Sequence, residues 1–432
     1  MSTLMNRFTG ILFSLLVITS CEDGDSLFHN EKAQGQSIPE LDYTTGFVAP
    51  ESVPVISDTE QGIADAVTVF GMEIFDSILQ DYASESVMYS PLSLSLALSM
   101  CLVGADGETE TQLSSLLGFE GYDKKDVASY YKAMIGRLMV LDKNVSFLSA
   151  NALWYDRDFS IKDHYLQTIG ENFDASAFKM DFDEAKSLID AINHWVSEKT
   201  QGTIKDIARN APPKPMLFAN ALYFKAGWAV VFGDKLEKGV FYATGGKEEA
   251  DFFVSRNSFE YSSADEYQIV LLPYGKPGED SFYEMAVVLP KQGVDVKQTL
   301  KWIRGTGVSI IDAMDYGCKK SDVRVEMPCF KIESSLSGIR ELLAVKCPAP
   351  FSGSDADFSG ISDERIFISD IAQKTYIKVD EKGTEASAVT EIAATSTGES
   401  QPEPIVFRAD HPFVFLIREK ETKSNIFIGV KQ

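Results

Sequence analysis

Apolar residues in the first half of the chain recur at the spacing of helices. From residue 63 to residue 78 they return every three or four positions, which predicts an amphipathic helix. A second segment, from about Glu184 to Lys199, carries its apolar side chains on one side and is followed by Gly202, a residue type that commonly ends helices. The positions that define these two apolar faces are Ile63, Val67, Phe70, Ile74, Ile78, Leu188, Ile192, Trp195 and Val196.

Two further helices are predicted from their first residues. Ser90-Pro91 has the order of an N-cap followed by proline at the first helical position, and it predicts a helix that runs to residue 103. Thr109 and Gln112 have the spacing of a capping box, which predicts another helix up to residue 117.

Strand patterns dominate the second half of the chain. QIVLLPY and FYEMAVVLP flank the turn sequence KPGED, as in a hairpin. Other predicted strands are NALWY, MLFANALYF, RVEMPCFKIE and IFISDIAQKTYIKV, and ADHPFVFLIREKETKSNIFIGVK reads as two strands around a polar turn. Helices early and strands late indicate an α+β fold with large sheets.

The segment 381–407, EKGTEASAVTEIAATSTGESQPEPIVF, has the composition of a loop that can become a strand. At period two, one face holds only uncharged and mostly small residues, which suit insertion between strands because charge or bulk would clash there. Gly383 provides a pivot, and Pro402 and Pro404 oppose strand pairing. A linker between domains is the simpler reading, but the chain beyond it is too short for a domain. The uncharged face is Thr384, Ala386, Ala388, Thr390, Ile392, Ala394 and Ser396.

Several segments resemble the serpins, a family that inhibits proteases by offering a loop, being cleaved, and inserting the loop into a central sheet. E-K-G-T-E-A-S-A-V-T followed by F-x-A-D-H-P-F-V-F-L-I is similar to the hinge and C-terminal signature of that family. The resemblance covers residues 58–432 and implies several helices around three β-sheets, with an exposed reactive-centre loop at about 381–407. Further colinear similarities are Y-S-P-L-S-L-S, G-A-D-G-E-T, I-N-H-W-V-S-E-K-T-Q-G-T-I-K-D-I, F-A-N-A-L-Y-F-K-A-G-W and D-A-D-F-S-G-I-S.

The resemblance also implies a hinge of the inhibitory type, because its first inward positions are uncharged. Family spacing places the residue before the scissile bond sixteen positions after Glu381, which is Thr397, so the expected reactive bond is Thr397-Gly398, with Ser396 as the alternative. The expected hinge residues are Glu381, Gly383, Thr384, Glu385, Ala386, Ser387, Ala388, Val389 and Thr390.

Small residues before the scissile bond favour elastase-like or subtilisin-like serine proteases as targets. Trypsin-like enzymes are disfavoured because no Arg or Lys occurs from residue 383 to residue 407. Cysteine proteases remain an alternative, as does a non-inhibitory surface binding protein on the same fold. No HExxH or G-x-S-x-G motif occurs, so we expect no enzymatic activity and no cofactor.

The resemblance also identifies individual residues that would control opening of the central sheet. Ser90, Ser93 and Asn220 match the polar cluster beneath the opening, although a helix cap explains the serines equally well. The usual histidine of that cluster is Gln373 here. Trp228 and Glu381 match the region where insertion begins, and Trp228 is equally well explained as a core aromatic. The lysine that often faces the glutamate is replaced by Cys329, so we expect no closing ion pair.

The N-terminus predicts export and a lipid anchor. Arg7 precedes a short apolar run that ends in Ile18-Thr19-Ser20-Cys21, which resembles a bacterial lipobox. We therefore expect a lipoprotein signal peptide at 1–20, lipidation at Cys21, a flexible acidic leash at 21–57 and the serpin domain at 58–432. The expected location is the outer membrane, at the cell surface of a gram-negative bacterium.

The net charge of −24 argues against nucleic acid or an anionic membrane surface as partner. The resemblance implies a monomer whose partners are target proteases. The cysteines match no metal motif, and the pairing of Cys318, Cys329 and Cys347 stays open.

Overall fold

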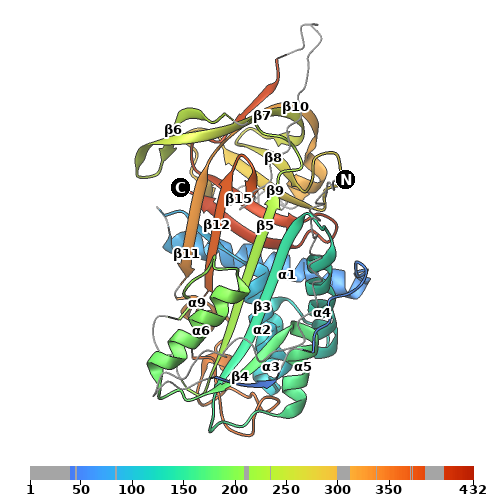
Figure 1. Ribbon diagram of the computed structural model, residues 1–432, viewed down its shortest axis with the longest axis vertical. Coiled ribbons are helices and arrows are strands. Elements are labelled where there is room, and N and C mark those ends of the chain that lie inside the picture. Colours follow the sequence, from blue (N-terminus) through green and yellow to red (C-terminus); the bar gives the residue numbers. More distant parts are fainter. Residues whose placement is uncertain are drawn as a thin grey trace, which may run out of the picture.

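Two large sheets and the helices packed on them make up the part of the protein that the structure describes (Figure 1). Its structure is a computed structural model, which describes residues 39–43, 46–82, 85–208, 214–233, 235–298, 312–336, 338–369, 371, 373–384 and 403–432. The α+β class expected from the sequence is confirmed. Helical segments with α, π or 3-10 geometry are α1 (Asp58–Asp81), α2 (Pro91–Val103), α3 (Gly107–Leu117), α4 (Lys124–Val140), α5 (Asp163–Phe173), α6 (Ala185–Lys199), η2 (Ala313–Gly317), α9 (Ile339–Lys346) and η3 (Ala349–Phe351).

The seven-stranded sheet runs along the long axis of the molecule, with α6 across its front (Figure 1). Trp195 of α6 packs edge-on against Trp154 of the sheet, with ring centroids 6.3 Å apart, so this helix and the sheet share an apolar core. In spatial order the strands are β1 (Glu40–Tyr43), β4 (Ala175–Met180), β3 (Val145–Asp156), β5 (Met216–Gly227), β13 (Gly383–Thr384), β12 (Gln373–Asp380) and β11 (Phe330–Leu336).

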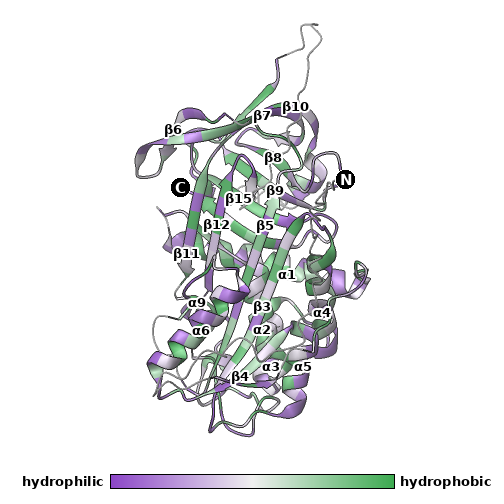
Figure 2. Ribbon diagram, viewed as in Figure 1, coloured by the Kyte–Doolittle hydropathy of each residue, from purple (hydrophilic) through white to green (hydrophobic). Residues whose placement is uncertain are grey.

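The nine-stranded sheet is continuous through one long strand, β7, which pairs with β6 through residues 246–252, with β10 through residues 252–261 and with β8 through residues 260–263. Two of the three sheets that the resemblance implied are therefore joined by hydrogen bonds. Its central strands β9 and β15 are buried throughout and appear mainly hydrophobic in Figure 2. The strands are β14 (Ile405–Arg408), β10 (Lys319–Pro328), β7 (Gly246–Ser263), β8 (Tyr267–Tyr274), β9 (Tyr283–Pro290), β15 (Phe413–Glu419), β16 (Asn425–Lys431) and β2 (Val87–Tyr89), with β6 (Glu237–Ala243) on β7.

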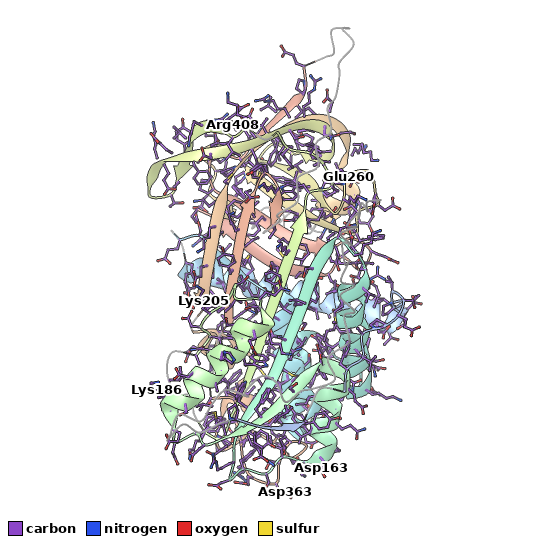
Figure 3. All side chains as sticks on the ribbon, viewed as in Figure 1. Asp163, Lys186, Lys205, Glu260, Asp363 and Arg408 are labelled. Atoms are coloured by element: carbon purple, nitrogen blue, oxygen red, sulfur yellow. The ribbon has the colours of Figure 1, made fainter. Side chains whose placement is uncertain are left out.

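The two ends of the long axis carry different parts of the chain. Arg408, at the end of β14, lies at one end, and Asp163 and Asp363 lie at the other (Figure 3). Because β5 and β12 run lengthwise between these ends, a strand inserted beside them would span much of the molecule (Figure 1). Within the described ranges, no helix combines the length and the apolar character needed to cross a membrane.

The helix predictions are confirmed for α1, α2 and α6, and one capping prediction is wrong. Ser90 is the N-cap of α2, and its side chain accepts a hydrogen bond from the backbone N–H of Ser93. Helix α3, however, begins at residue 107, so Thr109 lies inside it rather than at its cap. Thr109 is buried, and its hydroxyl accepts a bond from the backbone N–H of Asp357, 2.9 Å away, because this turn packs against a distant loop.

The strand predictions hold for the hairpin and the C-terminal pair, but three boundaries differ. RVEMPCFKIE is broken at Cys329 into β10 and β11, which belong to different sheets. In IFISDIAQKTYIKV the strand begins only at Gln373. The predicted leash is shorter than 21–57, because residues 40–43 form β1, which pairs with the edge strand β4.

Candidate functional site

The first hinge residues already occupy a strand position in the central sheet. Gly383 and Thr384 form β13, which pairs antiparallel with both neighbours: Thr384 lies opposite Ala226 of β5 and Val379 of β12. In the described part of the chain, β5 and β12 are joined through β13 and by no ladder of their own. Two hinge residues therefore bridge the opening into which the loop would insert.

Gly383 is required by the local geometry, as the pivot prediction implied. Its φ is +141°, a conformation that side-chain-bearing residues rarely adopt, and a Cβ there would lie 2.1 Å from the carbonyl oxygen of Ala226. Only glycine lets the chain approach β5 this closely, so the turn into the sheet depends on this residue.

Two stacked aromatic residues, Trp228 and Tyr274, lie beneath the hinge and are here called the aromatic floor. Trp228 stacks on Tyr274 with ring centroids 4.5 Å apart, and its indole N–H donates to the carbonyl oxygen of Asp380, 2.9 Å away. The backbone N–H of Trp228 donates to the carbonyl of Lys382 at 3.1 Å. Trp228 thus contacts the end of β12 and the turn after it, where the resemblance placed it. Tyr274 was not predicted from the sequence, because nothing local in QIVLLPY distinguishes it from a core aromatic.

The surroundings of Cys329 are acidic. Burial, together with the charges of Glu381, Asp380 and Asp251, raises the pKa of the Cys329 thiol to about 11, so the thiol is protonated at neutral pH. Lys378 contacts Asp380 at 2.9 Å, whereas Glu381 has no ion pair within the described residues.

A second polar group, here called the polar bridge, links the two sides of the opening through the start of α2. Gln373 of β12 binds Ser90 twice: its amide oxygen accepts from the Ser90 N–H at 2.8 Å, and its amide N–H donates to the Ser90 carbonyl at 3.0 Å. On the other side, the Ser93 hydroxyl donates to the Asn220 side chain of β5, which in turn donates to Asn151 of β3. The polar bridge is Ser90, Ser93, Asn151, Asn220 and Gln373.

All five members of the polar bridge are buried, and each side chain is bonded to another member. Asn151 was not predicted, although the strand register that places it directly opposite Asn220 could have been guessed once β3 and β5 were paired. The polar bridge lies six residues along β5 from Ala226, or about 20 Å at 3.3 Å per residue. The hinge strand β13 therefore holds the opening at its end, and the polar bridge holds it further along its length.

Several predicted site residues lie outside the described residues. They are Cys21, Glu385, Ala386, Ser387, Ala388, Val389, Thr390, Ser396, Thr397 and Gly398.

Among the described residues, neither the polar bridge nor the hinge strand β13 contains a cysteine or a histidine. Cys101, Cys318, Cys329 and Cys347 are free thiols, so the disulfide that the sequence left open does not form. In the part of the chain that the structure describes, no cluster of three or more His, Cys, Asp or Glu side chains could hold a metal ion.

Comparisons with known proteins agree with this architecture. A model of the serpin (serine protease inhibitor) family matches residues 65–431. The chain belongs to the serpin family. An uncharacterised serpin-like protein of Thermococcus kodakarensis is 30% identical over 375 residues, which cover 86% of this chain and 85% of the relative. The leukocyte elastase inhibitor of Xenopus tropicalis is 30% identical over 383 residues, which cover 85% and 98%.

Solved serpin structures share the fold. The native state of the thermophilic serpin tengpin superposes with a TM-score of 0.76 at 29% identity, and the match covers 91% of this chain and 99% of tengpin. Human thyroxine-binding globulin also reaches 0.76, at 22% identity, over 86% of this chain and 98% of the globulin. The second match shows the fold alone.

Proposed function

We propose that this serpin is a suicide-substrate inhibitor of serine proteases of the elastase-like or subtilisin-like class. The observation that carries the proposal is β13: the first two uncharged hinge positions already lie between β5 and β12, on the path of insertion. Thr384 is buried and uncharged, and the inward positions that follow it in the sequence are small or uncharged as well. A cleaved loop could therefore continue the strand that Gly383 and Thr384 begin.

The chemistry would belong to the protease, and the serpin itself would not be an enzyme. The catalytic serine hydroxyl attacks the carbonyl carbon of Thr397, an ester forms, the Thr397-Gly398 bond breaks, and the amine of Gly398 leaves with the proton. Residues 384–397 number fourteen, or about 46 Å when extended at roughly 3.3 Å per residue. Insertion would carry the bound protease toward the far end of the sheet before water hydrolyses the ester.

The stability gained on insertion would come from the backbone. Each hydrogen bond contributes roughly 0.5–1.5 kcal/mol net, so a strand of about a dozen residues paired on both sides can outweigh the entropy of ordering it. The aromatic floor and the polar bridge would keep the sheet closed behind β13 until cleavage. No cofactor is needed, and the monomer is the acting form.

A non-inhibitory serpin is the second candidate, and two observations favour it. Glu381 has no ion pair among the described residues, and Gln373 stands where the family usually has histidine, so two elements of the usual gate are changed. A cleaved but non-trapping surface protein would tolerate both changes.

The test mixes protein starting at Pro39 with pancreatic or neutrophil elastase, with the serpin in excess, and follows the mixture on denaturing gels and by mass spectrometry. We expect a covalent band at the summed mass and a released C-terminal fragment that begins at Gly398. The matched controls are Thr390→Arg, which charges an inward position and should convert the serpin into a substrate, and Glu391→Arg, which changes the outward neighbour and should not.

Complete cleavage with active protease would contradict the proposal if subtilisin-like enzymes gave the same result. A covalent band formed only with cysteine proteases would mean that the targets are cysteine proteases rather than serine proteases.

We also propose that Cys21 carries lipid and that residues 22–38 tether the domain to the outer membrane, with the domain at the cell surface. The support is the lipobox-like order Ile18-Thr19-Ser20-Cys21. Detergent-phase partitioning of the full chain, lost in Cys21→Ser, tests the anchor, and equal partitioning of both would overturn it. Cleavage of the anchored protein by protease added to intact cells tests the surface location.

A further inference from the structure

Tyr274 ends in a buried hydroxyl whose partner is the hinge. The side chain is fully buried at the end of β8, and its hydroxyl oxygen lies 2.6 Å from the hydroxyl oxygen of Thr384. Among the described residues this is the only hydrogen-bond partner of the Tyr274 hydroxyl. Because a buried hydroxyl without a partner is costly, Tyr274 favours the state in which Thr384 is seated.

The ring of Tyr274 is held firmly, so it cannot follow the hinge if the hinge moves. Trp228 stacks on one face with an interplanar angle of 11°, and Phe224 packs against it edge-on with ring centroids 5.2 Å apart. The next residue, Gly275, is tied to β5, because its N–H donates to the carbonyl of Gly227 at 2.9 Å. The hydroxyl thus marks a fixed point beside the first inserted residue.

A fixed hydroxyl at this point distinguishes one strand register from its neighbours. A slip of one residue would bring Gly383, which has no side chain, or Glu385, whose carboxylate would be buried, to the position of Thr384. A slip of two residues would bring Ala386, which cannot hydrogen-bond. Only Thr384 among these satisfies Tyr274.

We propose that Tyr274 is a positioning residue that sets the register of the inserting loop by pairing with the Thr384 hydroxyl. This inference rests on the proposed inhibitory function, which it deepens by naming how insertion starts. The paired hydroxyls hold a two-residue strand in place before cleavage, and the remaining loop residues then add to a strand whose register is already fixed.

The first test needs no protease. Hydrogen exchange of the amides of residues 383 and 384 is measured in the native protein and in Tyr274→Phe and Thr384→Val. Each substitution removes one hydroxyl and should speed exchange about fivefold, the change expected for losing roughly 1 kcal/mol of hydrogen bonding. Because the two hydroxyls are one pair, the double variant should exchange no faster than either single variant.

Two matched variants separate this role from general stability. Tyr283→Phe removes another buried tyrosine hydroxyl in the same aromatic core, one that donates to the carbonyl of Leu138 at 2.8 Å, and should leave hinge exchange unchanged. Thr384→Ser keeps a hydroxyl and should retain slow exchange. Unchanged exchange in Tyr274→Phe, or an equal increase in Tyr283→Phe, would overturn the proposal.

The second test uses a protease that the native serpin traps. Tyr274→Phe should leave the rate of initial loop cleavage unchanged and should raise the number of serpin molecules consumed per trapped protease, because insertion begins later. If no protease is trapped, the proposed function fails while the exchange result still decides whether Tyr274 holds the hinge. If Tyr274→Phe consumes the same number of serpin molecules per trapped protease as the native serpin, the role of Tyr274 in insertion is overturned.

Discussion

Gln373 makes the polar bridge insensitive to pH. Its amide accepts one hydrogen bond from Ser90 and donates another, and an amide does not titrate near neutrality. The other members, Ser93, Asn151 and Asn220, are also neutral at all physiological pH values. A histidine in the same place could make the same two bonds only while uncharged.

Replacing Gln373 with histidine should therefore introduce a pH dependence. A neutral imidazole can accept from the Ser90 N–H and donate to the Ser90 carbonyl, and burial would depress its pKa below the ordinary value of about 6.5. With a depressed pKa, the histidine takes up its proton more readily in the unfolded state than in the native state. The contribution of the histidine to the free energy of unfolding is therefore complete above about pH 6.5 and falls as the pH drops below this value. The thermal midpoint of Gln373→His, compared with that of the native protein at each pH, should match at pH 8 and diverge below about pH 6. A constant offset across this range would contradict the argument.

Elements that are determined by neighbouring residues in the sequence were predicted correctly. Features that depend on pairing with residues far away in the sequence were not. The Ser90-Pro91 cap lies within one turn of the helix that it starts, so the sequence was sufficient to predict it. The break at Cys329 was not predictable, because alternation continues across it and only the partners differ: β10 pairs with β7, whereas β11 pairs with β12. The same reason hid Tyr274, whose importance comes from a partner 110 residues away in sequence.

Strand β1 is the element for which the amino-acid composition was most misleading, because its segment was predicted to be a flexible leash. Its short sequence, Glu40–Tyr43, lies in a segment rich in acids and small residues, and it becomes a strand only because β4 offers an edge. Lys179 of β4 contacts Asp42 at 2.8 Å, and Tyr43 packs against Gly170 of α5. These contacts fasten the start of the described chain to the central sheet.

Removing β1 should lower the stability of the native state. A protein that starts at Gly46 loses the β1–β4 pairing, and we expect its denaturation midpoint to fall by about 2–4 °C, as for the loss of roughly 1 kcal/mol in a large domain. The matched control starts at Pro39 and keeps β1 while losing the same preceding segment. Equal midpoints for the two proteins would mean that β1 contributes nothing to stability.

Across the whole molecule, the opening between β5 and β12 runs lengthwise and is held at separate points. The hinge residues fill it at the end nearest the loop, and the polar bridge closes it about 20 Å further along β5. The helix start that carries Ser90 and Ser93 contacts both sides of the opening, so separating β5 from β12 breaks bonds at the same helix. This arrangement is compatible with the proposed insertion of one more strand between β5 and β12.

Cleavage of the loop should therefore raise the heat stability of the whole molecule. If the loop inserts, the added strand pairs with β5 and β12 along their length, and protein cut within residues 391–402 should denature well above the intact protein, by tens of degrees. Calorimetry of intact and cleaved samples measures this, after a protease has cut the loop and been removed. Thr390→Arg, cut in the same way, should gain little, because a charge at an inward position would have to be buried. A cleaved native protein with the midpoint of the intact one would leave the loop as an exposed substrate and would favour the non-inhibitory candidate.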